Sequence, residues 1–220
     1  MEPLALFPLN TVLFPGMPIH LHIFEDRYKL MIGRCIERRQ PFGVVLLQSG
    51  EEVQGFGAPA EPYLIGCMAH ITTVQPLGDG RLNIVAIGHE RFRIVEQHSD
   101  EPYLTATVEK LPLHNDDMGS LHTPALELRV WLRRYLALLE KLESTTYDTT
   151  ALPSNPIALS YLAASVLRIE STDKQPLLDE DDAQILITNV TKLYKREVTL
   201  IDIMADQLSR DQFVGPFSVN

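Results

Sequence analysis

A chain of 220 residues is long enough for one or two domains with a buried core, and its 45% hydrophobic and 22% charged residues exclude global disorder. Its formal net charge of -10 makes it a poor candidate for binding nucleic acid or an anionic membrane, because both require clustered positive charge. The only two cysteines, Cys35 and Cys67, exclude a disulfide framework and a CxxC zinc site, and they favour a reducing compartment.

Residues 3–24 contain no charged side chain, so a signal peptide or a membrane span has to be considered. Four prolines interrupt the segment, and the only charge that precedes it is Glu2, whereas a signal peptide begins with positive charge. The sequence therefore predicts a soluble, cytoplasmic protein.

The first 111 residues carry short runs with the period of β-strands. In one of them Ile19, Leu21 and Ile23 alternate with His20 and His22. An Asp-Gly turn divides two of the others. We expect strands close to residues 17–23, 42–47, 64–74, 82–87, 91–95 and 103–108. Frequent turns between short strands suggest a small barrel.

One helix interrupts these strands, at residues 25–38. It places apolar side chains three and four positions apart, which is the spacing of one buried helix face. These side chains are Tyr28, Met31, Ile32, Cys35 and Ile36.

Beyond residue 111 the apolar period becomes helical. Turn-forming residues predict a connector at 112–124, and helices are expected near 126–142, 156–167 and 179–204. The predicted organisation is a barrel subdomain at 1–111, this connector, a helical subdomain at 125–210 and a tail at 211–220.

Several short motifs follow one another in a fixed order along residues 4–204. They are Leu6-Phe7-Pro8-Leu9-Asn10, Val12-Leu13-Phe14-Pro15-Gly16-Met17, Ile23-Phe24-Glu25-Asp26-Arg27-Tyr28, Pro41-Phe42-Gly43-Val44-Val45, Gly66-Cys67-Met68-Ala69-His70-Ile71, Asp79-Gly80-Arg81-Leu82-Asn83, Gly88-His89-Glu90-Arg91-Phe92-Arg93-Ile94, the strand 101–109 and Lys174-Gln175-Pro176-Leu177-Leu178-Asp179. In this order they resemble the N-terminal, substrate-binding domain of Lon proteases. The resemblance implies an α+β fold, in which a PUA-like β pseudo-barrel with one inserted helix precedes a C-terminal helical bundle.

The resemblance also implies a role in recognising unfolded or tagged polypeptides for an ATP-dependent protease of the peptidase S16 type. The chain has no G-x-x-x-x-G-K-[ST] phosphate loop and no G-x-S-x-G nucleophile motif. We therefore expect a free-standing substrate-binding domain with no ATPase, no protease domain and no enzymatic activity.

Loop aromatics are the candidate substrate-binding residues. Phe14 and Met17 lie in one predicted loop, and Phe56 lies in a Gly/Pro-rich loop at 49–62. Solvent-facing aromatics on loops suit the binding of extended peptide. The alternative is that these side chains tuck under the barrel and anchor their loops.

Residues at the start of the predicted helix form the family's F-E-x-R-Y turn. Phe24, Glu25, Arg27 and Tyr28 carry this signature, and we interpret it as structural. In that interpretation Glu25 caps free N–H groups of the helix, Arg27 pairs with a carboxylate and Tyr28 packs in the core. The alternative makes Glu25 and Arg27 contacts to a ligand.

We expect no metal and no cofactor. His20 and His22 share a strand face, but a zinc site needs three or four ligands. The acidic run 179–182 lacks the spacing of a calcium loop and is better explained as the acidic start of a helix.

The function predicted from the sequence is recognition of unfolded or extended polypeptides by a non-enzymatic module. This module acts as an adaptor or a chaperone-like protein, and a protease is the second expected partner. Two alternatives stay open at this point. One is RNA binding, because PUA-like folds as a class include RNA binders, although the negative charge opposes it. The other is an enzyme of unknown type that acts on a small molecule in the barrel.

Overall fold

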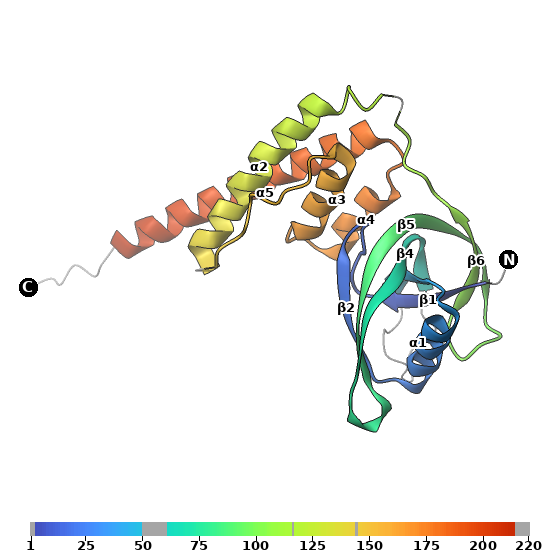
Figure 1. Cartoon of the computed structure of the whole chain (residues 1–220). Coiled ribbons are helices and arrows are strands. Elements are labelled where there is room, and N and C mark those ends of the chain that lie inside the picture. Colours follow the sequence, from blue (N-terminus) through green and yellow to red (C-terminus); the bar gives the residue numbers. More distant parts are fainter. Residues whose placement is uncertain (1–2, 50–60, 116, 144, 214–220) are drawn as a thin grey trace, which may run out of the picture. The chain divides into compact units, whose positions relative to one another are not determined.

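The computed structural model describes residues 3–49, 61–115, 117–143 and 145–213 (Figure 1). The chain forms two compact units, and each is built from two separate stretches of sequence. The strand-rich unit consists of residues 1–115 and 161–183, and the helical unit of residues 116–160 and 184–220. Whether these units match independent domains with the predicted limits stays a prediction.

The described strands of the first unit form one mixed sheet that curls into an incomplete barrel (Figure 1). Its strands are β1 (Leu4–Leu9), β2 (Pro18–Ile23), β3 (Phe42–Ser49), β4 (Glu61–Pro76), β5 (Leu82–His98) and β6 (Thr105–Lys110). Their order is β2-β5-β4-β3-β1-β6, and an additional pairing of β5 with β6 closes the ring and leaves β2 at its edge. The expected α+β fold with a barrel-like sheet is therefore confirmed.

The ring is closed unevenly. Parallel pairing joins β1 to β3 over four residue pairs, but β1 meets β6 at only two, Leu4 with Ala106 and Ala5 with Thr105. Elsewhere β6 runs beside β5 along its whole length, from Lys110 to Thr105. The last residues of β6 therefore continue past the beginning of β1.

The inserted helix α1 (Asp26–Arg38) is amphipathic as expected. Tyr28, Met31, Ile32 and Cys35 are buried, and they join the core residues of β1, β3 and β5. Ile36 was assigned to the same stripe, but it is 38% exposed, because it lies at the border of the buried face. Arg39 ends the helix in the left-handed conformation, at a φ of 53°.

A long hairpin of β4 and β5 forms the centre of the sheet. The predicted strands at 82–87 and 91–95 are one continuous strand, which the register shifts of the β4–β5 pair allow to bend around the barrel. The predicted Asp-Gly turn is present, with Asp79 and Gly80 both at positive φ. Gly66 in β4 allows close packing, because a Cβ there would lie 2.5 Å from the Val44 carbonyl oxygen.

The end of α3 (Pro156–Val166) and the short helix α4 (Ser171–Asp179) belong to the strand-rich unit. The Ser171 hydroxyl donates to the Asn10 carbonyl at 2.9 Å, and the Gln175 amide donates to the Ile65 carbonyl at 3.0 Å. The Tyr161 ring lies 6.1 Å from the Phe14 ring. These contacts fasten the helical segment to the outside of the barrel.

The helical unit contains α2 (His122–Glu143), the beginning of α3 and nearly all of α5 (Ala183–Phe213). Tyr135 of α2 and Tyr194 of α5 meet edge to face, with ring centroids 5.2 Å apart. Charged pairs flank them: Lys195 with Glu127 at 2.6 Å, and Arg134 with Asp202 at 2.7 Å. In the described part of the chain, no helix combines the length and the apolar composition that a membrane crossing requires.

Candidate functional site

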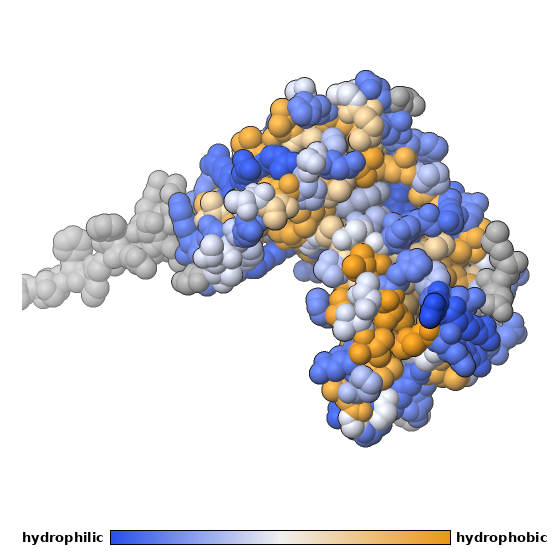
Figure 2. Space-filling model, in the orientation of Figure 1, coloured by the Kyte–Doolittle hydropathy of each residue, from blue (hydrophilic) through white to orange (hydrophobic). Residues whose placement is uncertain are grey.

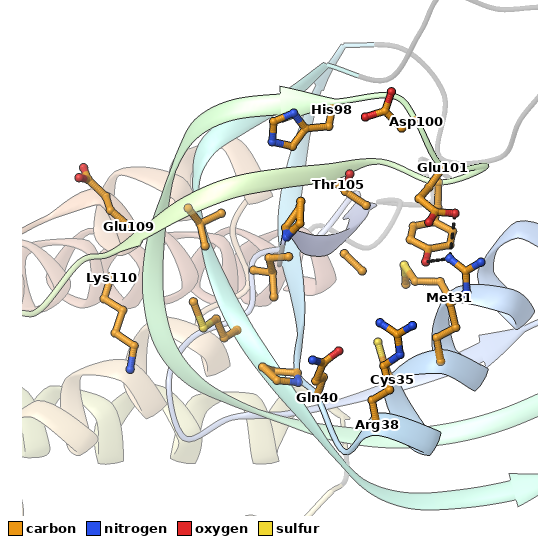
Figure 3. A pocket seen from close by; sticks show the side chains of 18 residues that line it. Met31, Cys35, Arg38, Gln40, His98, Asp100, Glu101, Thr105, Glu109 and Lys110 are labelled. Atoms are coloured by element: carbon orange, nitrogen blue, oxygen red, sulfur yellow. Dashed lines mark hydrogen bonds and ion pairs between the residues drawn. The ribbon is translucent and has the colours of Figure 1, made fainter. Parts of the chain in front are cut away.

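A cavity of about 870 Å³ opens in the strand-rich unit where the barrel closes unevenly; we call it the large cavity (Figure 3). Its walls come from α1, from the beginning of β1, from β6 and from the loop that precedes β6. Because β1 reaches β6 only at Ala106 and Thr105, the stretch from Val108 to Lys110 lines the opening instead of pairing with β1.

The lining combines two kinds of side chain. Buried or half-buried apolar groups form one part: Leu4, Ala5, Met31, Cys35, Met68 and Val108. Charged groups with more exposure form the other: Arg34, Arg38, Asp100, Glu101, Glu109 and Lys110. Three positive and three negative charges balance, so the cavity favours neither anions nor cations as a class.

Arg34 connects two walls of the large cavity, α1 and the loop before β6. From α1 its guanidinium donates to the Glu101 carboxylate at 2.8 Å and to the Tyr103 hydroxyl at 2.9 Å. The hydrogen bond to Glu101 is the main cause that raises the pKa of Arg34 above its usual value. Since Glu101 and Tyr103 lie in the loop before β6, this contact holds the helix and the loop at a fixed spacing.

The cavity holds one thiol, that of Cys35. Burial raises its pKa to about 11, so it is protonated at neutral pH and is not an activated nucleophile. The His98 ring, which also lines the cavity, shares a hydrogen bond of 2.8 Å with the Thr107 hydroxyl. With its thiol protonated, the cavity is better suited to binding a ligand than to nucleophilic catalysis by Cys35.

A second concavity of about 150 Å³ lies at the end of β2; we call it the small pocket. Its apolar walls are Phe7, Leu9, Leu21, Ile23 and Tyr28, and His22, Phe24 and Glu25 complete it. The Tyr28 ring is stacked on the Phe7 ring, with centroids 4.0 Å apart.

The F-E-x-R-Y signature lies beside the small pocket. Tyr28 is buried in the core as expected, and the Arg27 guanidinium lies 4.4 Å above its ring and 3.0 Å from the Glu25 carboxylate. The prediction that Glu25 caps the helix with its side chain is wrong, because that carboxylate pairs with Arg27 and makes no capping hydrogen bond. Phe24 is 49% exposed, and its ring lies beside the His22 ring, so whether it has a structural role stays a prediction. Ligand contact by these residues stays a prediction.

Two of the residues predicted to bind substrate, Phe14 and Met17, line neither concavity. Phe14 has no exposed surface, so the expectation that it faces solvent is wrong, and the alternative of a loop anchor describes its place against Tyr161. Met17 is half-buried and packs against the core. Phe56 lies outside the described residues.

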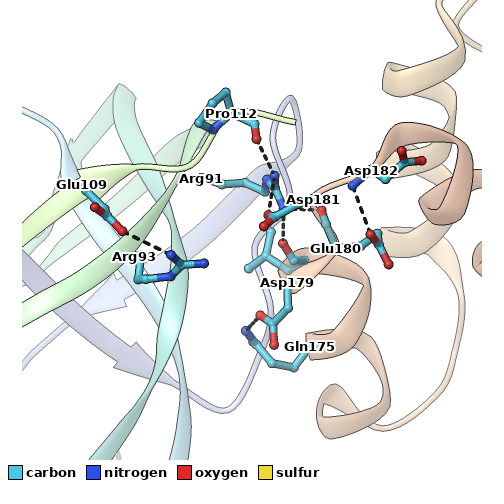
Figure 4. A network of polar contacts seen from close by, with 10 residues as sticks. Arg91, Arg93, Glu109, Pro112, Gln175, Asp179, Glu180, Asp181 and Asp182 are labelled. Atoms are coloured by element: carbon cyan, nitrogen blue, oxygen red, sulfur yellow. Dashed lines mark hydrogen bonds and ion pairs between the residues drawn. The ribbon is translucent and has the colours of Figure 1, made fainter. Parts of the chain in front are cut away.

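A network around Arg91 was not expected from the sequence (Figure 4). This arginine of β5 is 3% exposed, and it donates to the carbonyl groups of Leu178 at 2.7 Å and Pro112 at 3.1 Å. It also donates to the Glu180 carbonyl at 2.5 Å and contacts the Asp181 carboxylate at 3.4 Å. Because these partners lie up to 90 residues away along the chain, local sequence patterns do not reveal them.

The acidic run therefore has a different role from the predicted helix start. Asp179 ends α4, and α5 begins only at Ala183. The Gln175 amide donates to the Asp179 carboxylate at 2.6 Å, and burial is the main cause that raises the pKa of Asp179. Residues 180–182 connect α4 to α5, and Glu180 and Asp181 contact the buried guanidinium of Arg91.

The histidine pair considered for a metal lies on an exposed face of β2. His22 shares a hydrogen bond of 2.8 Å with the Asn83 side chain and lies beside the Phe24 ring. Over the described residues, no group of three or more His, Cys, Asp or Glu side chains is placed to hold a metal ion.

Comparison with known proteins gives a consistent result. Residues 3–196 match the model of the ATP-dependent protease La (LON) substrate-binding domain. The chain is 24% identical over 204 residues to Lon protease 2 of Syntrophobacter fumaroxidans and 26% identical over 228 residues to the Lon protease of Cytophaga hutchinsonii. These matches cover 92% and 96% of this chain but 25% and 27% of the relatives, so the chain spans about a quarter of their length.

Solved structures show the same fold. A Lon N-terminal domain protein from Xanthomonas campestris superposes with a TM-score of 0.63 at 24% identity, covering 86% of this chain and 97% of that one. The N-terminal domain of a Mycobacterium avium complex Lon protease gives 0.66 at 16% identity, covering 88% and 98%. The fold and the match over residues 3–196 together show that this chain belongs to the LON substrate-binding domain family.

Proposed function

We propose that the chain recognises unfolded or extended polypeptides without acting on them as an enzyme, and that the large cavity is the centre of this recognition. The observation that carries the proposal is the lining of the cavity, an apolar interior beside equal numbers of positive and negative groups. An unfolded polypeptide presents apolar side chains together with both kinds of charge, so such a lining suits it better than a phosphate-rich ligand. The net charge of -10 also disfavours the RNA alternative.

A cavity-filling variant tests this proposal. Val108 lies in the cavity wall on β6, and Val95 is a 62% exposed valine on β5 that is not among the cavity residues. We expect Val108→Trp to weaken binding of a reduced, carboxymethylated protein at least fivefold in fluorescence anisotropy titrations, and Val95→Trp to bind like the wild type. Circular dichroism melts check that both variants fold. Equal binding by folded Val108→Trp and wild type would overturn the role of the cavity.

The biological role that we propose is that of an adaptor for an ATP-dependent protease. The family supports this role, because the relatives that share this domain are named Lon proteases and are about four times as long. An adaptor accelerates degradation of its bound polypeptide when a Lon protease is added. A chaperone-like protein instead slows the aggregation of the polypeptide with no protease present, so the two assays separate the roles.

The proposal also predicts that the chain lacks hydrolytic activity of its own. Purified protein incubated with ATP, magnesium and casein should release neither phosphate nor peptides. ATP turnover that survives repurification would contradict the non-enzymatic part of the proposal.

A further inference from the structure

We propose that the open edge of β2 takes up a segment of the bound polypeptide as an added strand, with one of its apolar side chains in the small pocket. This inference rests on the proposed function and names a second contact surface for the same ligand. It concerns β2, the turn that follows it and the beginning of α1.

The first step is the pairing of β2. It runs antiparallel to β5 from the Pro18–Ile87 pair to the Ile23–Leu82 pair, and it stands at the end of the strand order. Within the stretches of chain that the structure describes, no strand pairs with its other edge. In these residues, the edge of β2 that faces away from β5 is therefore open to another strand.

The direction of the main-chain groups follows from one hydrogen bond. The Gly88 N–H donates to the Met17 carbonyl at 2.9 Å, just before β2 begins. Partners in an antiparallel pair alternate, so the main-chain groups of every second residue from Met17 onward face β5. The N–H and C=O groups of His20 and His22 then face the open edge, where another extended chain can pair with them.

The composition of β2 protects this edge only at its first residue, Pro18, which lacks an N–H group. Natural sheets guard open edges with charged side chains, prolines or bulges. The sequence Pro-Ile-His-Leu-His-Ile contains no Lys, Arg, Asp or Glu, and its one proline stands at the first position. Main-chain groups arranged along a strand select an extended polypeptide, which is the chemistry of strand addition.

The small pocket supplies the second half of the recognition. Its volume of about 150 Å³ is below the roughly 300–1,000 Å³ of small-molecule sites, so it has room for a single large side chain. The walls are aromatic and aliphatic, and the Glu25 carboxylate at the border is paired with Arg27. In the space-filling view, hydrophobic residues gather on the face of the barrel between β2 and α1 (Figure 2). An uncharged apolar side chain fits this environment.

The open edge of β2 and the small pocket together define the class of ligand. Side chains of a strand alternate between its two faces, so a segment paired with β2 directs every second side chain toward the same face as the pocket. We infer that the preferred segments are extended, uncharged and rich in Val, Ile, Leu or Phe at alternate positions. Such segments are buried in folded proteins and become exposed on unfolding.

Backbone methylation of the ligand tests strand addition directly. The probe is a fluorescein-labelled twelve-residue peptide with alternating Val and Thr flanked by lysines, prepared with N-methyl groups on either the odd or the even residues. Pairing with one edge uses the N–H groups of only one set. We therefore expect one methylated peptide to bind at least tenfold more weakly and the other to bind like the parent. Equal effects of both methylated peptides would overturn the inference.

Variants of β2 test the protein side. Proline lacks an N–H group and is tolerated on edge strands, so His20→Pro should weaken peptide binding at least tenfold, whereas His20→Val, which keeps the N–H, should not. Phe24→Ala should weaken it about fivefold, and Val95→Ala, at a similarly exposed apolar site outside the pocket, should have no effect. Thermal melts show whether each variant is folded. Wild-type affinity of folded His20→Pro would contradict the inference.

The experiments separate failure of this inference from failure of the proposed function. If wild-type protein binds neither the peptide nor a carboxymethylated protein, both are overturned. If it binds both ligands, loses them in Val108→Trp and keeps them in His20→Pro and Phe24→Ala, the large cavity alone recognises polypeptide and β2 does not.

Discussion

Arg91 and Arg34 each join distant parts of the strand-rich unit, but their surroundings are opposite. Arg91 is almost completely buried, and most of its partners are main-chain carbonyl groups, two around the end of α4 and one at Pro112 (Figure 4). Arg34 lies at the large cavity with a side chain 37% exposed, and its partners are the side chains of Glu101 and Tyr103. Burial makes the first arginine part of the scaffold and leaves the second accessible to a ligand.

The comparison extends to the regions around the two residues. On the covered side, where α4 lies against the barrel, Phe14 and Tyr161 fill the space. On the cavity side, between α1 and β6, a volume of about 870 Å³ is open. Substitutions on the covered side should therefore change stability, and those on the cavity side should change binding.

The largest effect is expected for Arg91→Ala. It leaves three carbonyl groups and the Asp181 carboxylate without their donor, so the free energy of unfolding should fall by about 4 kcal/mol, measured by urea titration. The matched control is Arg93→Ala, which removes an exposed pair with Glu109 and should cost less than about 1 kcal/mol. Similar losses in both variants would show that burial does not distinguish them.

Phe14→Ala is expected to cost about 3 kcal/mol of stability, because a fully buried ring is lost beside Tyr161. Thermal and urea melts measure this loss. The exposed Phe24 is the control, and its replacement by alanine should leave the stability nearly unchanged. A stable Phe14→Ala protein would mean that the covered side can collapse around the missing ring.

The two thiols should differ about tenfold in reactivity. Burial raises the pKa of Cys35, on the cavity side, to about 11 and that of Cys67, in the interior, to about 12. At pH 8 the thiolate of Cys67 is therefore about ten times rarer, and alkylation by iodoacetamide, followed by mass spectrometry, should reach Cys35 first. Faster alkylation of Cys67 would show that the interior opens more readily than the cavity.

The raised pKa values of the two thiols also predict how the free energy of unfolding changes with pH. Both thiols ionise less readily in the folded protein, so the stability that they contribute is complete below their ordinary pKa near 9 and is lost as the pH rises toward 11–12. Urea midpoints measured between pH 8 and pH 10.5 should fall, and a Cys35→Ala, Cys67→Ala double variant should show a shallower fall.

The smallest effect on stability is expected for Arg34→Ala. Its ion pair with Glu101 is partly exposed on both sides, so the urea midpoint should stay close to the wild-type value. Binding of an unfolded polypeptide should change, because the contact that spaces α1 from the loop before β6 is lost. A strong loss of stability would show that Arg34, like Arg91, is part of the scaffold.

Local patterns were sufficient to predict the barrel and its inserted helix. The alternation from Ile19 to Ile23 and the stripe from Tyr28 to Cys35 each report which face of an element is buried, and the structure confirms both. The Asp-Gly turn at residues 79–80 needs only the conformational preferences of its own residues. Features of this kind are decided within a few residues of sequence.

Features that depend on distant partners were not predicted. Nothing in the residues beside Arg91 shows that its acceptors lie at Pro112, at the end of α4 and in the segment after α4. Nothing beside Phe14 shows that Tyr161 covers it. The large cavity depends on how far β1 overlaps β6, which is a property of strand register. The exposed Phe24 was grouped with its structural neighbours because they share one motif.

The discontinuous make-up of the strand-rich unit has a consequence for biosynthesis. Arg91 leaves the ribosome long before the residues around Asp181 that accept its hydrogen bonds, and translation at roughly 5–20 residues per second places seconds between the two events. During that interval the nascent barrel carries an Arg91 guanidinium that lacks its acceptors at Leu178, Glu180 and Asp181, and the Phe14 ring is not covered by Tyr161. The barrel therefore reaches its final stability only after the helices that follow it have been synthesised. A slow stretch of translation before residue 183 would prolong the time for which Phe14 and Arg91 are exposed to solvent.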